Sequence, residues 1–111
     1  MSAERLKRLN ALHEERRRAP RDDVDFATVA ARGWTEKFDV RLLNISPMGF
    51  HARAKSEFER GQKLRIRLPI VGEMEGQVAW ALNGCCGGWF IDPLSPEHYA
   101  AVLAAIKGAN G

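Results

Sequence analysis

The sequence predicts a mainly β protein, a six-stranded antiparallel β-barrel that ends in an α-helix. Between Val24 and Asp92 apolar residues recur with a period of two, which is the spacing of strands with one buried face. No segment with helical periodicity separates these runs, so we expect consecutive strands to pair antiparallel. A sheet of this size usually closes into a barrel, because closure removes its exposed edges.

The first expected element is a short N-terminal helix over residues 3–16. Ser2 can cap its start, and Leu6 and Leu9 fall near one face together with His13. The apolar stripe is thin, and Pro20 ends the segment. We therefore treat residues 1–15 as a helical extension and residues 16–108 as one barrel domain with its C-terminal helix.

Six strands are expected next, separated by turn residues. The fourth has the cleanest alternation, from Leu64 to Ile70, and a turn is expected after it at Val71-Gly72. Asn83-Gly84 suits a tight connection between the last two strands, since both residues tolerate positive φ. The predicted strands cover residues 24–31, 34–43, 49–54, 63–70, 74–82 and 87–92.

The last expected element is a helix over residues 96–107. Ser95 is its expected N-cap, Pro96 its first residue, and Gly108 the residue just past its end. Tyr99, Val102, Leu103 and Ile106 form an apolar stripe with helical spacing. This stripe predicts that the helix plugs or flanks the barrel.

Composition and targeting signals indicate a cytoplasmic globular protein. The 111 residues suit one domain, and 45% hydrophobic with 28% charged residues is ordinary for a soluble protein. The N-terminus has no apolar signal-peptide core, and no apolar run approaches the roughly 18 residues of a membrane helix. Cys85 and Cys86 are adjacent, so they pair poorly and are expected on opposite faces of a strand.

Positive charge is concentrated near the N-terminus. The stretch EERRRAPRDD, residues 14–23, contains Arg16, Arg17, Arg18 and Arg21. From Arg5 to Arg21 there are seven Lys or Arg and two acidic residues. This local excess indicates an anionic partner, although a solvated charge run and a nucleic-acid arm are alternatives at this point.

Residues that could perform catalysis or hold a metal lack the required spacing. His13, His51 and His98, with the two cysteines, show no C-x-x-C or H-x-x-x-H pattern. Ser46 lies in NISPMG rather than in a G-x-S-x-G elbow, and no G-x-x-x-x-G-K-[ST] loop is present. We therefore expect a protein that is not an enzyme and that uses no metal or cofactor.

Two short motifs lie on either side of the first predicted hairpin. Arg17 to Arg21 reads R-x-x-x-R, and the link between the second and third strands reads N-x-S-x-x-G with Asn44, Ser46 and Gly49. Alone, the first is compatible with a solvated linker and the second with an ordinary turn.

Taken together, the motifs resemble those of the PilZ domain family over about residues 16–106. Both are complete and in the family's order, one hairpin apart, and the later positions Val78, Trp80, Gly88 and Phe90 agree. The resemblance implies a standalone member of a bacterial family of small six-stranded barrels, many of which bind the second messenger cyclic di-GMP. It also implies a ligand site formed by Arg17, Arg21, Asn44, Ser46 and Gly49.

These residue types suit the chemistry of cyclic di-GMP. The arginine fork binds phosphate, or guanine O6 and N7, with two hydrogen bonds, and its flat face stacks on a base. Asn44 and Ser46 supply donors and acceptors for a guanine edge, and Gly49 allows positive φ and close approach by a ring or phosphate. The family resemblance further implies a helper arginine, for which Arg16 is the candidate, and hence a ligand bound as an intercalated dimer.

Two tryptophans and one arginine remain beside this expected site. Trp80 alternates with Val78, which favours packing in the core or barrel over stacking on a base. Trp89 is expected on the opposite face from Phe90, near the ligand or a partner. Arg18 is expected to be a bystander.

The leading interpretation is a non-enzymatic receptor for cyclic di-GMP that signals to an unknown protein partner by conformational change. One alternative is an interaction adaptor that acts through its barrel surface without nucleotide. Another is a basic barrel that binds single-stranded nucleic acid. The lack of an aromatic ladder on the exposed strand faces disfavours the nucleic-acid function.

Overall fold

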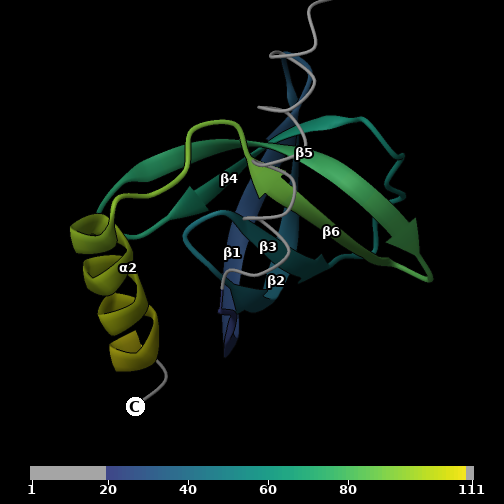
Figure 1. Ribbon diagram of the computed structural model, residues 1–111. Coiled ribbons are helices and arrows are strands. Elements are labelled where there is room, and N and C mark those ends of the chain that lie inside the picture. Colours follow the sequence, from purple (N-terminus) through teal and green to yellow (C-terminus); the bar gives the residue numbers. More distant parts are fainter. Residues whose placement is uncertain (1–19, 110–111) are drawn as a thin grey trace, which may run out of the picture.

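Six antiparallel strands form a closed barrel in the computed structural model, which describes residues 20–109 (Figure 1). Around the barrel the strands follow the order β1-β2-β3-β6-β5-β4, and one helix follows them in the described part of the chain. The predicted fold class is confirmed. The predicted helix over residues 3–16 lies outside the described residues. The elements are β1 (Asp22–Arg32), β2 (Glu36–Ile45), β3 (Gly49–Arg53), β4 (Lys63–Leu68), β5 (Gly72–Leu82), β6 (Cys85–Phe90) and α2 (Pro96–Ala109).

The barrel core consists of the alternate apolar residues that the sequence pattern selects. Along β4, Leu64, Ile66 and Leu68 are buried, whereas Lys63 and Arg67 are exposed. Each observed strand boundary lies within two residues of the predicted one. Between β5 and β6, Asn83 and Gly84 both have positive φ, of 51° and 79°, and they form the predicted tight turn.

The β4–β5 connection differs from the prediction, because Ile70 belongs to the turn and not to the strand. Ile70 has a φ of 72° and is 67% exposed. The N–H of Val71 donates to the carbonyl of Pro69 at 2.8 Å, which closes a three-residue γ-turn centred on Ile70. A β-branched residue at positive φ is strained, so this turn reduces the stability of the hairpin.

Replacing Ile70 with glycine is expected to stabilise the protein. Glycine removes the left-handed strain of about 1–2 kcal/mol and loses about 0.5–1 kcal/mol through the entropy of the unfolded chain. We expect a net increase of about 0.5–1 kcal/mol in the free energy of unfolding, measured by urea titration. Ile70→Ala is the matched control because it keeps the Cβ atom, and an equal gain in both variants would contradict the assignment to strain.

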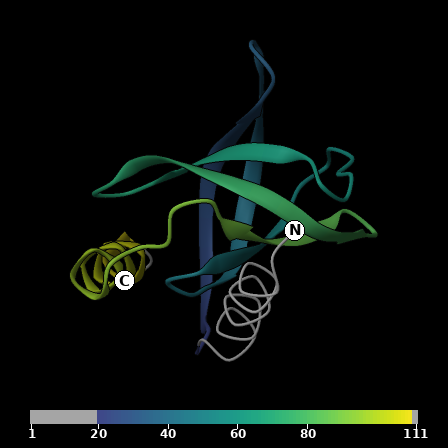
Figure 2. The ribbon, with the colours of Figure 1, turned by 45° about the horizontal axis from the view of Figure 1, so that its top comes forward.

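The C-terminal helix α2 flanks the barrel instead of plugging it. Figure 2 shows α2 beside the strands, where it contacts β1. Ser95 caps the helix as predicted, with its Oγ accepting the N–H of His98 at 3.1 Å. Val102 and Ile106 of the predicted stripe are fully buried. The predicted end was wrong by two residues, because Gly108 lies within the helix.

Candidate functional site

The structure describes four of the six predicted ligand residues, and they come from two separate segments. Arg21 lies immediately before β1, Asn44 near the end of β2, Ser46 in the following turn, and Gly49 at the start of β3. The other two, Arg16 and Arg17, lie outside the described residues, as does Arg18.

Arg21 and Asn44 are in contact although 23 positions separate them. The guanidinium Nη1 of Arg21 donates to Oδ1 of Asn44 at 3.4 Å. The β1–β2 register explains this contact, because Asp23 and Asn44 are directly opposed. The two motifs therefore meet on the outer surface of the barrel, at the end where β1 begins.

His51 and Trp80, which the motifs do not include, extend this contact across the sheet. The register places Asn44 opposite His51, His51 opposite Gly87, and Gly87 opposite Trp80, on four adjacent strands. Nδ2 of Asn44 lies 3.1 Å from Nδ1 of His51, and the His51 and Trp80 rings are 5.2 Å apart at a tilt of 58°. We call Arg21, Asn44, His51 and Trp80 the outer row.

The prediction that Trp80 packs in the core is wrong. Trp80 is 42% exposed, because a β-bulge between Val78 and Trp80 shifts the alternation of β5 by one residue. Gly87 makes room for the indole: a Cβ atom at Gly87 would lie 2.2 Å from Nε1 of Trp80. The bulge and the glycine together lay the indole against the outer face of the barrel.

Ser46 shapes the turn between β2 and β3 from a buried position. It is 1% exposed, and its Oγ accepts the backbone N–H of Gly49 at 3.0 Å and of Met48 at 3.2 Å. Its own N–H donates to the carbonyl of Gly49 at 2.9 Å. Ser46 thus fixes the backbone of the turn, a role distinct from the expected reading of a guanine edge.

Gly49 is required by close strand packing. Gly49 does not use the positive φ that glycine allows, because it is not among the described residues with that conformation. A Cβ atom at this position would lie 2.3 Å from the carbonyl oxygen of Gly88 on β6. Gly49 therefore allows β3 to approach β6 closely. Through this packing it positions the β3 residues of the outer surface.

Tyr99 attaches the helix to both segments of the candidate site. Its hydroxyl contacts the carboxylate of Asp22, the residue after Arg21, and lies 2.9 Å from the carbonyl oxygen of Ile45, the residue after Asn44. Burial raises the pKa of the Tyr99 hydroxyl well above its usual value, and the neighbouring Asp22 carboxylate is the second cause. The hydroxyl therefore stays protonated and can donate to these oxygens at physiological pH.

The described part of the chain, residues 20–109, contains no candidate metal site. No group of three His, Cys, Asp or Glu side chains there is placed to hold a metal ion.

Cys85 is half-buried and Cys86 is buried, on opposite faces of β6 as predicted. Burial raises the pKa of the Cys86 thiol to about 12, with the neighbouring Cys85 as a second cause. Trp89 is half-buried on the outer face, opposite Gly49.

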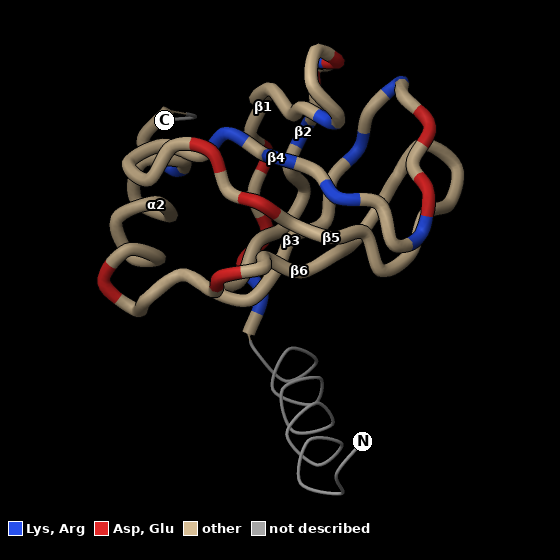
Figure 3. Tube along the Cα trace, turned by 90° about the horizontal axis from the view of Figure 1, so that it is seen from above, with Lys and Arg blue, Asp and Glu red and all other residues tan. Residues whose placement is uncertain are grey.

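Charge on the barrel itself is balanced. Residues 20–109 contain eleven Lys or Arg and eleven Asp or Glu, so the formal charge of +3 lies entirely in residues 1–19. In Figure 3 basic and acidic residues are both spread over the barrel. None of the helices in this part of the chain is both long and apolar enough to cross a membrane.

His51 is expected to make stability pH-dependent. Burial lowers its pKa below the usual 6.5, and the charges of Arg21 and Arg53 lower it further. The unfolded chain therefore takes up this proton first, and the free energy of unfolding falls as pH drops from 6.5 through the lowered pKa. Above 6.5 the imidazole is largely neutral in both states, and its contribution to the pH dependence fades.

Urea titrations at about pH 7.5 and about pH 5.5 measure this effect. The loss of stability at the lower pH should be larger in the wild-type protein than in His51→Gln, which cannot titrate. Equal losses in the two proteins would show that other groups cause the pH dependence.

Comparison with profiles of known protein families gives no match, and comparison with curated protein sequences gives none either. A functional assignment therefore depends on the motifs and on the geometry of the outer row.

Proposed function

We propose that the protein is a bacterial, cytoplasmic, non-enzymatic receptor for cyclic di-GMP, of the PilZ type that its motifs resemble. The observation that carries the proposal is the contact between Arg21 and Asn44. It joins the R-x-x-x-R and N-x-S-x-x-G motifs on one surface, beside an imidazole and a half-exposed indole.

The outer row offers the groups that a guanine nucleotide needs. Arg21 is exposed, and within residues 20–109 its guanidinium has one long hydrogen bond to exchange for a bidentate contact with phosphate or guanine. Asn44 supplies a donor and an acceptor for the base edge. The indole of Trp80 provides a flat face on which a base can stack. His51 lies between Asn44 and Trp80 and holds Asn44 in position.

In this proposal Arg17 and Arg21 bind one nucleotide, and Arg16 helps to hold a second one stacked on it as an intercalated dimer. The positive charge of residues 1–19 attracts the two phosphates. The signal reaches a protein partner through a change in the position of the arginine segment. The balanced charge of the barrel does not favour the alternative of single-stranded nucleic-acid binding, which depends on a basic groove.

A calorimetric titration with cyclic di-GMP tests the proposal, with tryptophan fluorescence as a second readout. We expect saturable binding, two ligand molecules per chain, and a change in emission that Trp80→Leu reduces. GTP and a short oligothymidylate are the controls and should not compete at equal concentration. Absence of binding in both readouts, or equal competition by the oligonucleotide, would contradict the proposal.

A further inference from the structure

Within the described part of the chain, one half of β2 has no strand on the side that faces away from β1. β2 pairs with β1 along its whole length, but its pairing with β3 extends only from Ile45 to Arg41. After Arg53 the chain turns away, and the N–H of Ala54 donates to the carbonyl of Gly84 at 2.9 Å. Among residues 20–109, no strand pairs with the side of residues 37–40 of β2 that faces away from β1, so they present an open backbone edge. At this edge every second residue points its N–H and C=O away from β1.

A groove of about 500 Å³ lies along this open edge. Its apolar lining consists of four residues from β1, β2 and the chain that follows β3, namely Ala27, Phe38, Val40 and Ala54. Backbone groups and apolar side chains thus lie together in one groove. We call this site, between residues 37–40 of β2 and residues 53–56, the β2 groove.

Free positive charge borders the β2 groove. Arg53 and Lys55 line it, and neither forms a hydrogen bond or an ion pair with another residue of the described chain. Arg41 also lines the groove but is paired with Asp25. Asp39 is the single acidic residue of the lining. An acidic occupant would therefore pair with charges that have no partner among residues 20–109.

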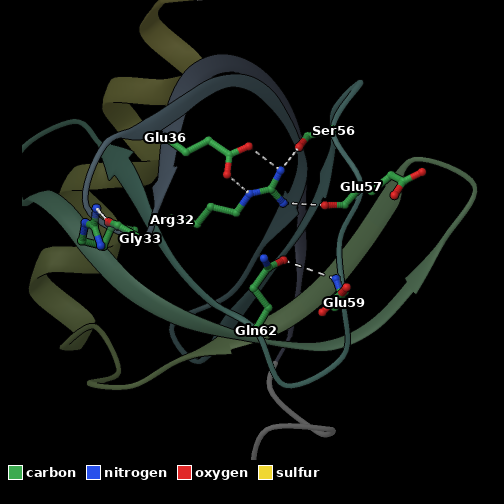
Figure 4. A network of polar contacts seen from close by, with 8 residues as sticks. Arg32, Gly33, Glu36, Ser56, Glu57, Glu59 and Gln62 are labelled. Atoms are coloured by element: carbon green, nitrogen blue, oxygen red, sulfur yellow. Dashed lines mark hydrogen bonds and ion pairs between the residues drawn. The ribbon is translucent and has the colours of Figure 1, made fainter.

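Next to Ser56, at the far end of the β2 groove, Arg32 bridges Glu36 and the loop after β3 (Figure 4). Its guanidinium binds the carboxylate of Glu36 through two hydrogen bonds of 2.7 and 2.8 Å. The same guanidinium donates to Ser56 and to the carbonyl of Glu57, and it lies 4.8 Å above the ring of Phe38. These bonds tie the loop after β3 to the end of β2, where the rings of Phe38 and Phe58 also lie 6.0 Å apart. This wall of the groove is therefore in place before any partner binds.

We propose that the β2 groove binds an extended acidic segment of a partner protein, which adds as a strand to residues 37–40. Strand addition satisfies the open backbone groups, and alternate side chains of the added strand point to opposite faces. Apolar residues of the segment would contact Val40 and Ala54, and acidic residues would contact Arg53 and Lys55. This site is separate from the nucleotide contacts of the outer row and does not depend on them.

Charge excludes the two occupants that the chain itself could provide. In a second copy, the same edge would bring Arg53 and Lys55 toward their equivalents, and like charges that meet across an interface disfavour it. The chain's own residues 1–19 carry six Lys or Arg against three acidic residues, so their charge also matches that of the groove. The occupant that the charge of the groove favours is therefore an acidic segment of another protein.

Amide chemical shifts and amide hydrogen exchange of the full chain test the proposal, with a blocked heptapeptide of alternating glutamate and valine as the probe. We expect weak binding, with a Kd on the order of 1 mM. Residues 37–40 should shift and exchange more slowly. The exposed double variant Arg53→Glu/Lys55→Glu should bind the probe at least tenfold more weakly and should instead bind a lysine–valine peptide.

Three controls separate strand addition from other binding. A glutamate–valine peptide with N-methyl groups on its two central residues loses a donor on each edge and should not protect residues 37–40. The lysine–valine peptide and a short oligothymidylate should leave these amides unchanged in the wild-type protein. Equal shifts with any of the three, or no shift at residues 37–40 with the glutamate–valine probe, would overturn the proposal.

Discussion

Replacing Arg21 with alanine is expected to weaken cyclic di-GMP binding by about 10- to 150-fold. Hydrogen bonds to a charged group contribute about 1.5–3 kcal/mol, and 1.4 kcal/mol corresponds to a factor of ten in Kd. Arg21 is exposed and makes one long hydrogen bond with the other described residues, to Asn44, so its loss should not change the free energy of unfolding by more than about 0.5 kcal/mol. Calorimetry and urea unfolding of the same sample measure both quantities.

Arg67→Ala is the matched control for this variant. Arg67 is an exposed arginine on β4, and its side chain has no hydrogen bond or ion pair with the other described residues. Arg67→Ala removes one positive charge, as Arg21→Ala does, but from a position outside the outer row. Arg21→Lys adds a second comparison, because lysine keeps the charge but not the fork, and it should bind nearly as weakly as Arg21→Ala. If Arg67→Ala and Arg21→Ala lose affinity equally, Arg21 acts only through net charge.

Replacing Gly49 with alanine is expected to destabilise the protein by about 3 kcal/mol or more. The added methyl group would lie 2.3 Å from the backbone oxygen of Gly88, and neither backbone can move without breaking the β3–β6 pairing. Overpacking a core typically costs about 1–3 kcal/mol, and a clash between two backbones belongs at or above the top of that range. Urea unfolding without ligand measures the loss.

Gly108→Ala is the control for this prediction. A Cβ atom at Gly108 meets nothing within 4 Å, and the residue lies in α2, where alanine favours the helix. This variant should keep or slightly raise the free energy of unfolding. If Gly49→Ala unfolds at the wild-type urea concentration and loses only ligand affinity, the glycine serves the ligand directly and our assignment to strand packing is wrong.

Local patterns were enough to predict the fold. Alternation along β4 and the helical spacing of Val102 and Ile106 both reflect burial of one face, and burial is decided by residues a few positions apart. Ser95 and Asn83-Gly84 were also identified correctly, because capping and tight turns depend on neighbouring backbone groups. The conformation of Ile70 was missed, since an isoleucine at positive φ contradicts its own local preference.

The candidate site could be predicted only in part. The motifs contain Arg21 and Asn44, which the structure brings together, but they gave no indication of His51 or Trp80. The β-bulge in β5 explains this failure for Trp80, because one extra residue reverses every inward and outward assignment that follows it. The available signal was Gly87, which makes room for a large side chain on the neighbouring strand.

The sequence by itself determined the barrel class, the strand boundaries to within two residues, the capped helix and the positions of two motifs. Only the tertiary structure decided which side chains share the outer row, why Gly49 must be glycine, and where β2 keeps an open edge. The physical reason is the range of the interactions. Alternation, caps and turns are set within a few residues, whereas register, bulges and backbone approach depend on strands that are distant in the chain and meet only when the barrel closes.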